Sequence, residues 1–255
     1  MLIPYFIHKL KFLKSLTWVY ASVGIVALGI VLILGSTTYG SKISYSVAGV
    51  TFQPSEFVKI IFVFFLASAL YESHDFLHVM ITAVVAGVHV LVLVASRDLG
   101  SALIFFIVYV MMVFIATGNW LYLFLGSGGG CGAAVLAYQF FTHVQVRVQA
   151  WRDPFSCIDD AGYQITQSLF AISSGGWFGM GLFRGTPGSI PFVEADFVFS
   201  AVAEELGIAF SMCVILICVS CFIMFMDISI RLQDRFYRLI AFGLGVVYIF
   251  QVFLT

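Results

Sequence analysis

Seven long apolar runs dominate the sequence, and each has roughly the length that a helix needs to cross a lipid bilayer. A membrane-spanning helix takes about 20 predominantly apolar residues. The runs cover residues 17–35, 54–71, 77–95, 100–117, 120–141, 197–226 and 236–255. Hydrophobic residues make up 62% of the chain and charged residues only 10%, whereas a soluble domain carries about 25% charged residues. The sequence therefore predicts an all-α integral membrane protein, with about seven transmembrane helices in a single polytopic domain over residues 1–255.

Two clusters of basic residues predict the orientation in the membrane, because cytoplasmic loops carry an excess of Lys and Arg. The first cluster precedes the first run and comprises His8, Lys9, Lys11 and Lys14. Counting crossings from a cytoplasmic N-terminus puts residues 142–196 outside. The same count puts the second cluster inside, at Arg231, Arg235 and Arg238. Both clusters thus agree with one large extracytoplasmic loop over residues 142–196.

The loop at 142–196 is the least lipid-like part of the chain, and long loops in compact proteins are usually functional. On the outside no ATP is available, so a reaction there needs a substrate that carries its own activation. The net charge of −1 argues against a nucleic-acid partner, which requires a basic face. The loop is therefore the expected place of the chemistry.

Two opposite charges stand near the start of the second run, in Gln53-Pro-Ser-Glu-Phe-Val-Lys59. Glu56 and Lys59 are three residues apart and share a helix face. A charge at mid-membrane costs about 2.5–3.5 kcal/mol on insertion scales, so the two either pair or line a polar cavity. An ion pair that holds two helices together and a pair of substrate-binding residues are both open.

The outer loop offers further candidates for substrate binding. It begins with Arg147 in RVQAWRDP and continues through GYQITQS and SSGGWFGMG. Glycines let backbone N–H groups approach an anion closely, although a tight turn between interfacial helices is the alternative. The candidate substrate-binding residues of these segments are Arg147, Gln164, Gln167, Ser168, Gly175 and Gly176.

Three acids lie along the start of the sixth run, at Asp196, Glu204 and Glu205. Asp196 alone is a natural helix N-cap. Three acids near one helix face are harder to explain as caps, and they favour a polar cleft that opens outward. Burial there would tune a carboxylate for proton abstraction or for binding a divalent cation.

Six motifs follow one another along the chain: QPSE with Lys59, RDLG, RVQAWRDP, GYQITQS, SSGGWFGMG, and ADFVF followed by AEELG. Their order is that of the SEDS family, the RodA, FtsW and SpoVE polymerases of the bacterial cell wall, which this chain resembles over residues 12–255. The resemblance implies a partial ten-helix SEDS fold in the bacterial cytoplasmic membrane. It also implies a peptidoglycan glycosyltransferase that polymerises lipid II at the outer face of that membrane, in elongation, division or sporulation, together with a class B penicillin-binding protein.

The resemblance assigns the essential outer-loop aspartate of the family to Asp196, and the paired charges of its QPxExxK motif to Glu56 and Lys59. The family has ten spans, whereas this chain offers about seven. By this comparison, we expect one or two helices before Leu16 to be missing and the family's sequence to continue beyond Thr255. We expect a chain truncated at both ends, whose activity by itself is open.

The mechanistic hypothesis makes Asp196 the general base on the acceptor hydroxyl, with Lys59 and Arg147 offsetting charge on the diphosphate of lipid II. Glu204 and Glu205 are further candidates for substrate binding. A divalent cation, Mg²⁺ or Mn²⁺, at Asp196 stays open, and no other cofactor is expected. The expected partners are lipid II, a class B penicillin-binding protein and membrane lipid. Two alternatives remain, a lipid II flippase and a non-catalytic scaffold for the penicillin-binding protein.

Overall fold

The computed structural model describes residues 11–38, 41–47, 50–71, 75–194 and 196–254. Within this described part, a helix occupies each of the seven predicted runs. They are α2 (Thr17–Leu34), α3 (Pro54–Leu70), α4 (Phe76–Ala95), α5 (Leu99–Thr117), α6 (Trp120–Phe140), α9 (Val198–Arg231) and α10 (Arg235–Leu254). Five of them, all except α2 and α3, are long and apolar enough to cross a membrane. With 18 and 17 residues, α2 and α3 lie at the short end of the spanning range. The all-α membrane fold is confirmed.

The connections also contain regular structure. A short 3-10 helix, η1 (Lys11–Ser15), precedes α2. Between α2 and α3, an antiparallel sheet in the order β1-β2-β3 is formed by β1 (Ser36–Thr38), β2 (Ser41–Val47) and β3 (Val50–Phe52). The predicted outer loop lies between α6 and α9 and is largely helical. It contains α7 (Thr142–Arg152), η2 (Pro154–Cys157), α8 (Tyr163–Gly175) and η3 (Pro187–Ser189).

The chain divides into two compact units, which we describe separately. The first comprises Met1–Ser127 and Phe222–Leu254, and the second comprises Gly128–Cys221. The boundaries fall inside α6 and α9, so neither unit corresponds to a separate stretch between loops. The single domain expected over residues 1–255, like the sidedness of residues 142–196, stays a prediction.

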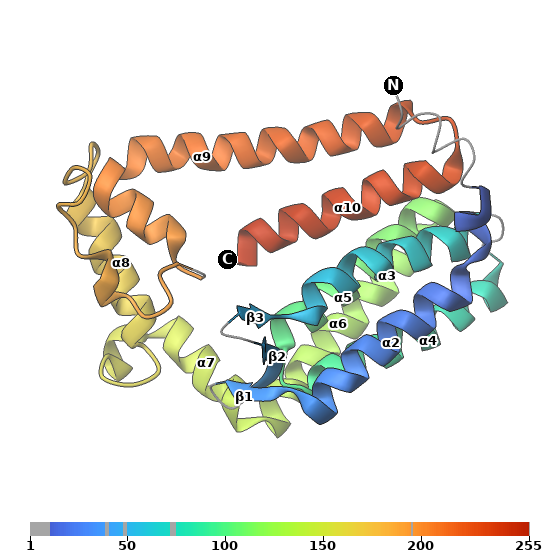
Figure 1. The fold of residues 1–255 in the computed structure, drawn as a ribbon, viewed down its shortest axis with the longest axis horizontal. Coiled ribbons are helices and arrows are strands. Elements are labelled where there is room, and N and C mark those ends of the chain that lie inside the picture. The colour runs from blue at the N-terminus through green and yellow to red at the C-terminus, as the bar shows by residue number, and fades with distance from the viewer. Residues whose placement is uncertain (1–10, 39–40, 48–49, 72–74, 195, 255) are drawn as a thin grey trace. The chain divides into compact units, whose positions relative to one another are not determined.

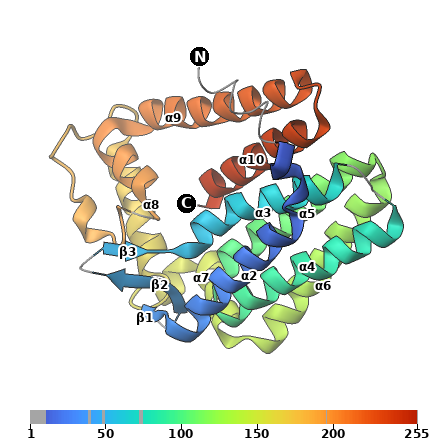
Figure 2. The same cartoon turned by 45° about the vertical axis from the view of Figure 1, so that its right-hand side comes forward.

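In the first unit, α3 is the central helix. It packs against α2, α5 and α10, while α4 packs against α2 and α5, and these helices lie side by side in Figures 1 and 2. The core is built from large side chains that are almost fully buried, among them Phe62, Leu66, Phe105, Met112 and Phe236. Close packing of such side chains stabilises helix pairs in lipid, where the hydrophobic effect between helices is absent.

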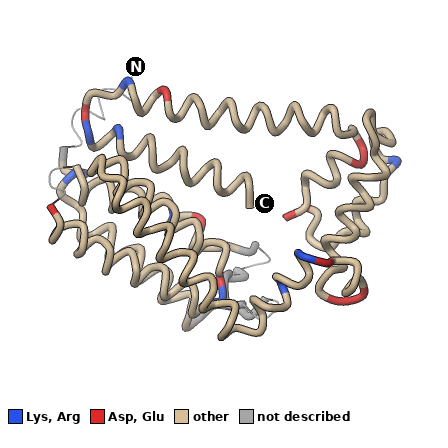
Figure 3. The backbone as a smooth tube through the Cα atoms, turned by 180° about the vertical axis from the view of Figure 1, so that it is seen from behind, with Lys and Arg blue, Asp and Glu red and all other residues tan. Residues whose placement is uncertain are grey.

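Charged residues are confined mostly to helix ends and connections, as Figure 3 shows. This pattern is expected of helices that cross lipid, because an unpaired charge there is costly. Among the described residues, the buried charged side chains are Lys59, 3% exposed, and Glu204, 5% exposed. Both were predicted as site residues, so their surroundings decide what they do.

Candidate functional site

The start of α3 and the start of α5 meet in a polar cluster of the first unit. The Asp98 carboxylate accepts hydrogen bonds from the Ser55 hydroxyl at 3.2 Å and from the Gln53 amide at 3.4 Å. It also caps α5 by accepting from the Ser101 N–H at 3.1 Å. The fold therefore joins the QPSE and RDLG motifs, which sequence reasoning treated separately.

Lys59 lies in the second turn of α3, and its ammonium group has two partners. Its Nζ is 2.7 Å from Glu56 Oε1 and 2.5 Å from the amide oxygen of Gln251 on α10. Glu56 is half-exposed, whereas Lys59 is buried. An ion pair and a hydrogen bond to a neighbouring helix compensate the burial of the ammonium. This geometry supports the alternative of a pair that links helices, and the substrate-binding role of Glu56 and Lys59 stays a prediction.

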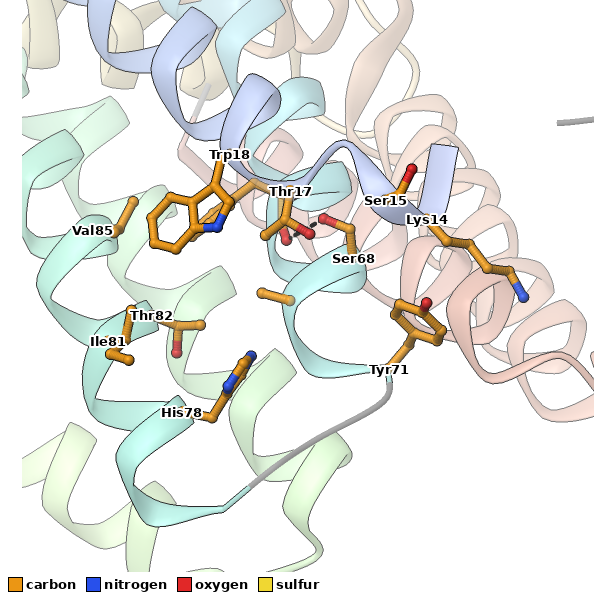
Figure 4. A pocket seen from close by; sticks show the side chains of 12 residues that line it. Lys14, Ser15, Thr17, Trp18, Ser68, Tyr71, His78, Ile81, Thr82 and Val85 are labelled. Carbon is orange, nitrogen blue, oxygen red and sulfur yellow. Dashed lines mark hydrogen bonds between the residues drawn. The ribbon is translucent and has the colours of Figure 1, made fainter. Parts of the chain in front are cut away.

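A cavity of about 400 Å³ lies at the opposite end of α3 from Lys59. As Figure 4 shows, it is lined by side chains from the start of α2, the end of α3 and the start of α4, including Trp18, Ser68 and His78. Lys14 at its edge forms an ion pair with Asp234 at 2.6 Å. None of the predicted site residues lines this cavity, so it is not part of the candidate site.

In the second unit, the glycine-rich segment after α8 packs directly on α9. The chain of α9 breaks at Gly207, which has a φ of +84°. Gly179 has a φ of +78°, and a Cβ there would fall on the backbone oxygen of Glu205. Only glycine adopts such a backbone conformation without strain. These two glycines let two backbones come into direct contact, and the Ile208 N–H donates to the Gly176 oxygen at 2.9 Å.

The carboxylates of Glu204 and Glu205 bind the loop that follows the glycine-rich segment. Glu204 Oε1 accepts from the Thr186 N–H at 3.0 Å, and Glu205 Oε1 accepts from the Phe183 N–H at 3.1 Å. Glu204 Oε2 is buried and has no hydrogen-bond partner among the described residues. We expected acids that open outward, whereas Glu204 is buried beneath this loop, where the Thr186 N–H satisfies one of its carboxylate oxygens.

The candidate residues of α8 face α9 to different degrees. The Ser168 hydroxyl is 2.5 Å from the Ser200 hydroxyl of α9, and both residues are buried. Gly175 is buried against the backbone of Ala203. Gln164 and Gln167 are half-buried. Ser168 and Gly175 therefore serve the packing of α8 on α9, and the two glutamines remain accessible for binding.

Asp196 lies in the exposed turn that precedes α9. Its N–H donates to the Phe192 oxygen at 3.0 Å. Its carboxylate has no hydrogen bond or ion pair with another described residue, and α9 begins two residues later, at Val198. The structure thus gives no support to the helix-cap alternative. It leaves an exposed carboxylate beside the first turn of an apolar helix.

A second cavity, of about 430 Å³, lies on one face of α7. Its lining includes Gln145, Val148, Gln149 and Arg152, which follow the spacing of one helix face. Arg147 is exposed but does not line this cavity. Of the two arginines in RVQAWRD, only Arg147 was predicted to bind substrate, although the spacing of the polar residues could have identified Arg152.

A metal site made by the protein alone is not found in the described part of the chain. No group of three or more His, Cys, Asp or Glu side chains there is placed to hold a metal ion. A divalent cation at Asp196 therefore stays a prediction.

The chain is similar to known proteins over its whole length. The family model of the cell cycle proteins FtsW, RodA and SpoVE matches residues 1–255. The chain is 31% identical over 238 residues to the peptidoglycan glycosyltransferase RodA of Mycobacterium tuberculosis, a match that covers 85% of the chain and 50% of that protein. It is 31% identical over 235 residues to the probable peptidoglycan glycosyltransferase FtsW of Geobacter sp. strain M18, covering 87% and 62%. The chain thus spans about half the length of the first of these curated relatives.

The fold is also shared with a solved structure. A chain of a peptidoglycan synthase complex superposes with a TM-score of 0.77, covering 95% of this chain and 69% of that one at 22% sequence identity. At this identity, the likeness establishes the fold alone.

Proposed function

Because the chain belongs to the SEDS family of RodA, FtsW and SpoVE proteins, we propose that it acts as a peptidoglycan glycosyltransferase that polymerises lipid II at the outer face of the cytoplasmic membrane. It is a multi-pass protein of the bacterial cytoplasmic membrane. The names of the 31% identical RodA and FtsW relatives support the activity.

The single observation that carries the proposal is the exposed carboxylate of Asp196 beside the first turn of α9. A base for this reaction must reach a sugar hydroxyl at the membrane surface while the polyprenyl chain of the donor stays in lipid. An exposed acid next to an apolar helix meets both requirements. The half-buried Gln164 and Gln167 of the same unit are candidate partners for sugar hydroxyls.

In the proposed reaction, the acceptor hydroxyl attacks the anomeric carbon of the donor sugar. A new carbon–oxygen bond forms, and the bond to the diphosphate breaks with its electron pair leaving on the diphosphate. Asp196 accepts the proton of the hydroxyl, and such a base contributes about 10²–10⁴-fold. The exposed cations Arg147 and Arg152 on α7 offset the charge that develops on the leaving group.

A divalent cation would act in this proposal only by offsetting negative charge. Mg²⁺ is commonly held by one or two carboxylates together with substrate phosphates. Asp196 therefore fits Mg²⁺ or Mn²⁺ only in company with the diphosphate, where the ion would offset negative charge. No proton transfer above depends on it.

We also propose a class B penicillin-binding protein as the partner. The shared fold with a chain of a peptidoglycan synthase complex supports this assignment, since such a complex joins strand synthesis to crosslinking. A lipid II flippase and a non-catalytic scaffold remain the competing functions. The flippase predicts translocation of lipid II without glycan-chain formation in the reconstituted protein, and the scaffold predicts that Asp196 is dispensable.

The decisive experiment compares Asp196→Asn with Glu194→Gln in the purified protein, reconstituted in bilayers with lipid II. Glu194 is a matched control because it is an exposed acid in the same turn. We expect Asp196→Asn to lose about 10²-fold or more of the polymerisation rate, and Glu194→Gln to stay close to wild type. Full activity of Asp196→Asn would overturn the assignment of the base.

A further inference from the structure

The two most exposed apolar side chains described in the second unit, Phe183 and Phe178, lie in one short loop, residues 177–183, which we call the aromatic loop. Phe183 is 93% exposed, Phe178 89% and Trp177 72%. Leu182 and Met180 are exposed as well. Single exposed apolar residues are ordinary, but five exposed apolar side chains within seven consecutive residues mark a segment that contacts lipid or another molecule.

The aromatic loop is held in place by α9, so its exposure is built into the fold. The Met180 N–H donates to the Glu204 oxygen at 2.9 Å, and the Gly181 N–H donates to the Glu205 oxygen at 3.0 Å. The Phe183 N–H donates to the Glu205 carboxylate. These bonds fix the loop at the level of Glu204 and Glu205 on α9.

The sequence of α9 shows how deep that level lies in the membrane. Residues 208–226 carry no charged side chain, and Asp227 and Arg231 follow them. At a rise of about 1.5 Å per residue, such a run is about 28 Å long, close to the roughly 30 Å thickness of the hydrocarbon layer. If Asp227 marks one border of the lipid core, the break at Gly207 marks the other. Glu204 and Glu205 then lie at the opposite interface, which is the outer one in the orientation predicted from the basic clusters.

We propose that the aromatic loop is an interfacial anchor, which places Trp177, Phe178 and Phe183 among the headgroups and upper acyl chains of the outer leaflet. Aromatic side chains favour this depth of a bilayer. The exposed Arg184 directly follows the loop, and a cation there can reach lipid phosphates while its stem lies along apolar surface. The proposed ligand is therefore bilayer lipid, and the inference does not depend on the proposed reaction.

The test uses Trp177 as the reporter, because the sequence holds only three other tryptophans, Trp18, Trp120 and Trp151. Replacing these three by Phe leaves a protein whose emission comes from the aromatic loop. It is reconstituted in phosphatidylcholine–phosphatidylglycerol bilayers with acyl chains brominated at shallow or deep positions. Aqueous iodide is the second quencher.

We expect shallow bromines to quench most of the Trp177 emission, and iodide to have little effect. Replacing Phe178 and Phe183 by Ser should weaken the bromine quenching and increase the iodide quenching, because the loop loses its apolar contacts with lipid. Strong quenching by iodide with no effect of bromine would overturn the proposal. An aromatic loop that binds a protein partner in the cell, and not lipid, would also show strong iodide quenching in the purified protein. That result therefore refutes lipid as the ligand in either case.

Discussion

The hydrogen bond between Glu204 and the loop after the glycine-rich segment should control how fast the Thr186 amide exchanges its hydrogen, to a degree that depends on the residue at position 204. In Glu204→Ala the Thr186 N–H loses its acceptor, which lies at 3.0 Å in the wild type. A hydrogen bond to a charged group contributes about 1.5–3 kcal/mol, and each 1.4 kcal/mol changes an equilibrium about tenfold. We therefore expect the Thr186 amide to exchange its hydrogen roughly 10- to 150-fold faster. Glu204→Gln keeps a carbonyl acceptor and should give an intermediate rate.

Hydrogen exchange followed by mass spectrometry, on the peptide that contains Thr186 in the bilayer-embedded protein, measures this effect. Glu194→Ala is the matched control, because Glu194 is exposed in the same loop and has no hydrogen bond with another described residue. Its exchange should equal that of the wild type. The reasoning is refuted if Glu204→Ala also exchanges at the wild-type rate, or if Glu204→Gln is as fast as Glu204→Ala.

Two further predictions concern stability. Ser168→Ala leaves the buried Ser200 hydroxyl without its partner at 2.5 Å, and Ser200→Ala does the same to Ser168. Each single variant should lose about 1–3 kcal/mol of unfolding free energy, and the double variant should lose less than the sum of the two. Additive losses, measured by denaturant titration, would contradict this. Burial raises the pKa of Asp234, but the hydrogen bond from Lys14, backbone N–H groups and the Lys14 charge lower that pKa more, to below its ordinary value of 3.8. The resulting stabilisation of the folded protein is complete above pH 3.8 and is lost as the pH falls through the lowered pKa. The unfolding temperature of Asp234→Asn should therefore decrease less on acidification than that of the wild type. Parallel pH curves for the two proteins would argue against the Lys14 pair.

The positions of the helices were predictable, because the signal is local. Each predicted run and the helix that occupies it agree closely at their starts, as for residues 17–35 and α2. Lipid imposes a length and an apolar composition on every crossing, and both can be read from consecutive residues. The strands between α2 and α3 were not predicted, although the alternation of Ile43, Tyr45 and Val47 within β2 is typical of a strand.

The candidate site was predicted only in part. The outer-loop acid Asp196 was found from its motif, and it proved to be exposed. Asp98 was not predicted as a site residue, because a charged turn at a membrane interface is ordinary by itself, and Arg152 was not chosen beside Arg147. Their significance comes from neighbours, such as Ser55 for Asp98, that belong to other elements or to another turn of the same helix.

The sequence alone determined three properties of this protein: its location in a lipid bilayer, the positions of its helices and its family. All three follow from the order and polarity of neighbouring residues. The tertiary structure decided which polar groups have hydrogen-bond or ion-pair partners in the protein and which stay exposed. Lys59 meets Gln251, which lies 192 residues along the chain, and Glu204 turns under the loop at Thr186, whereas Asp196 stays exposed. Those outcomes depend on the packing of distant segments, because a buried charge must find its partner wherever the fold brings one within hydrogen-bond distance.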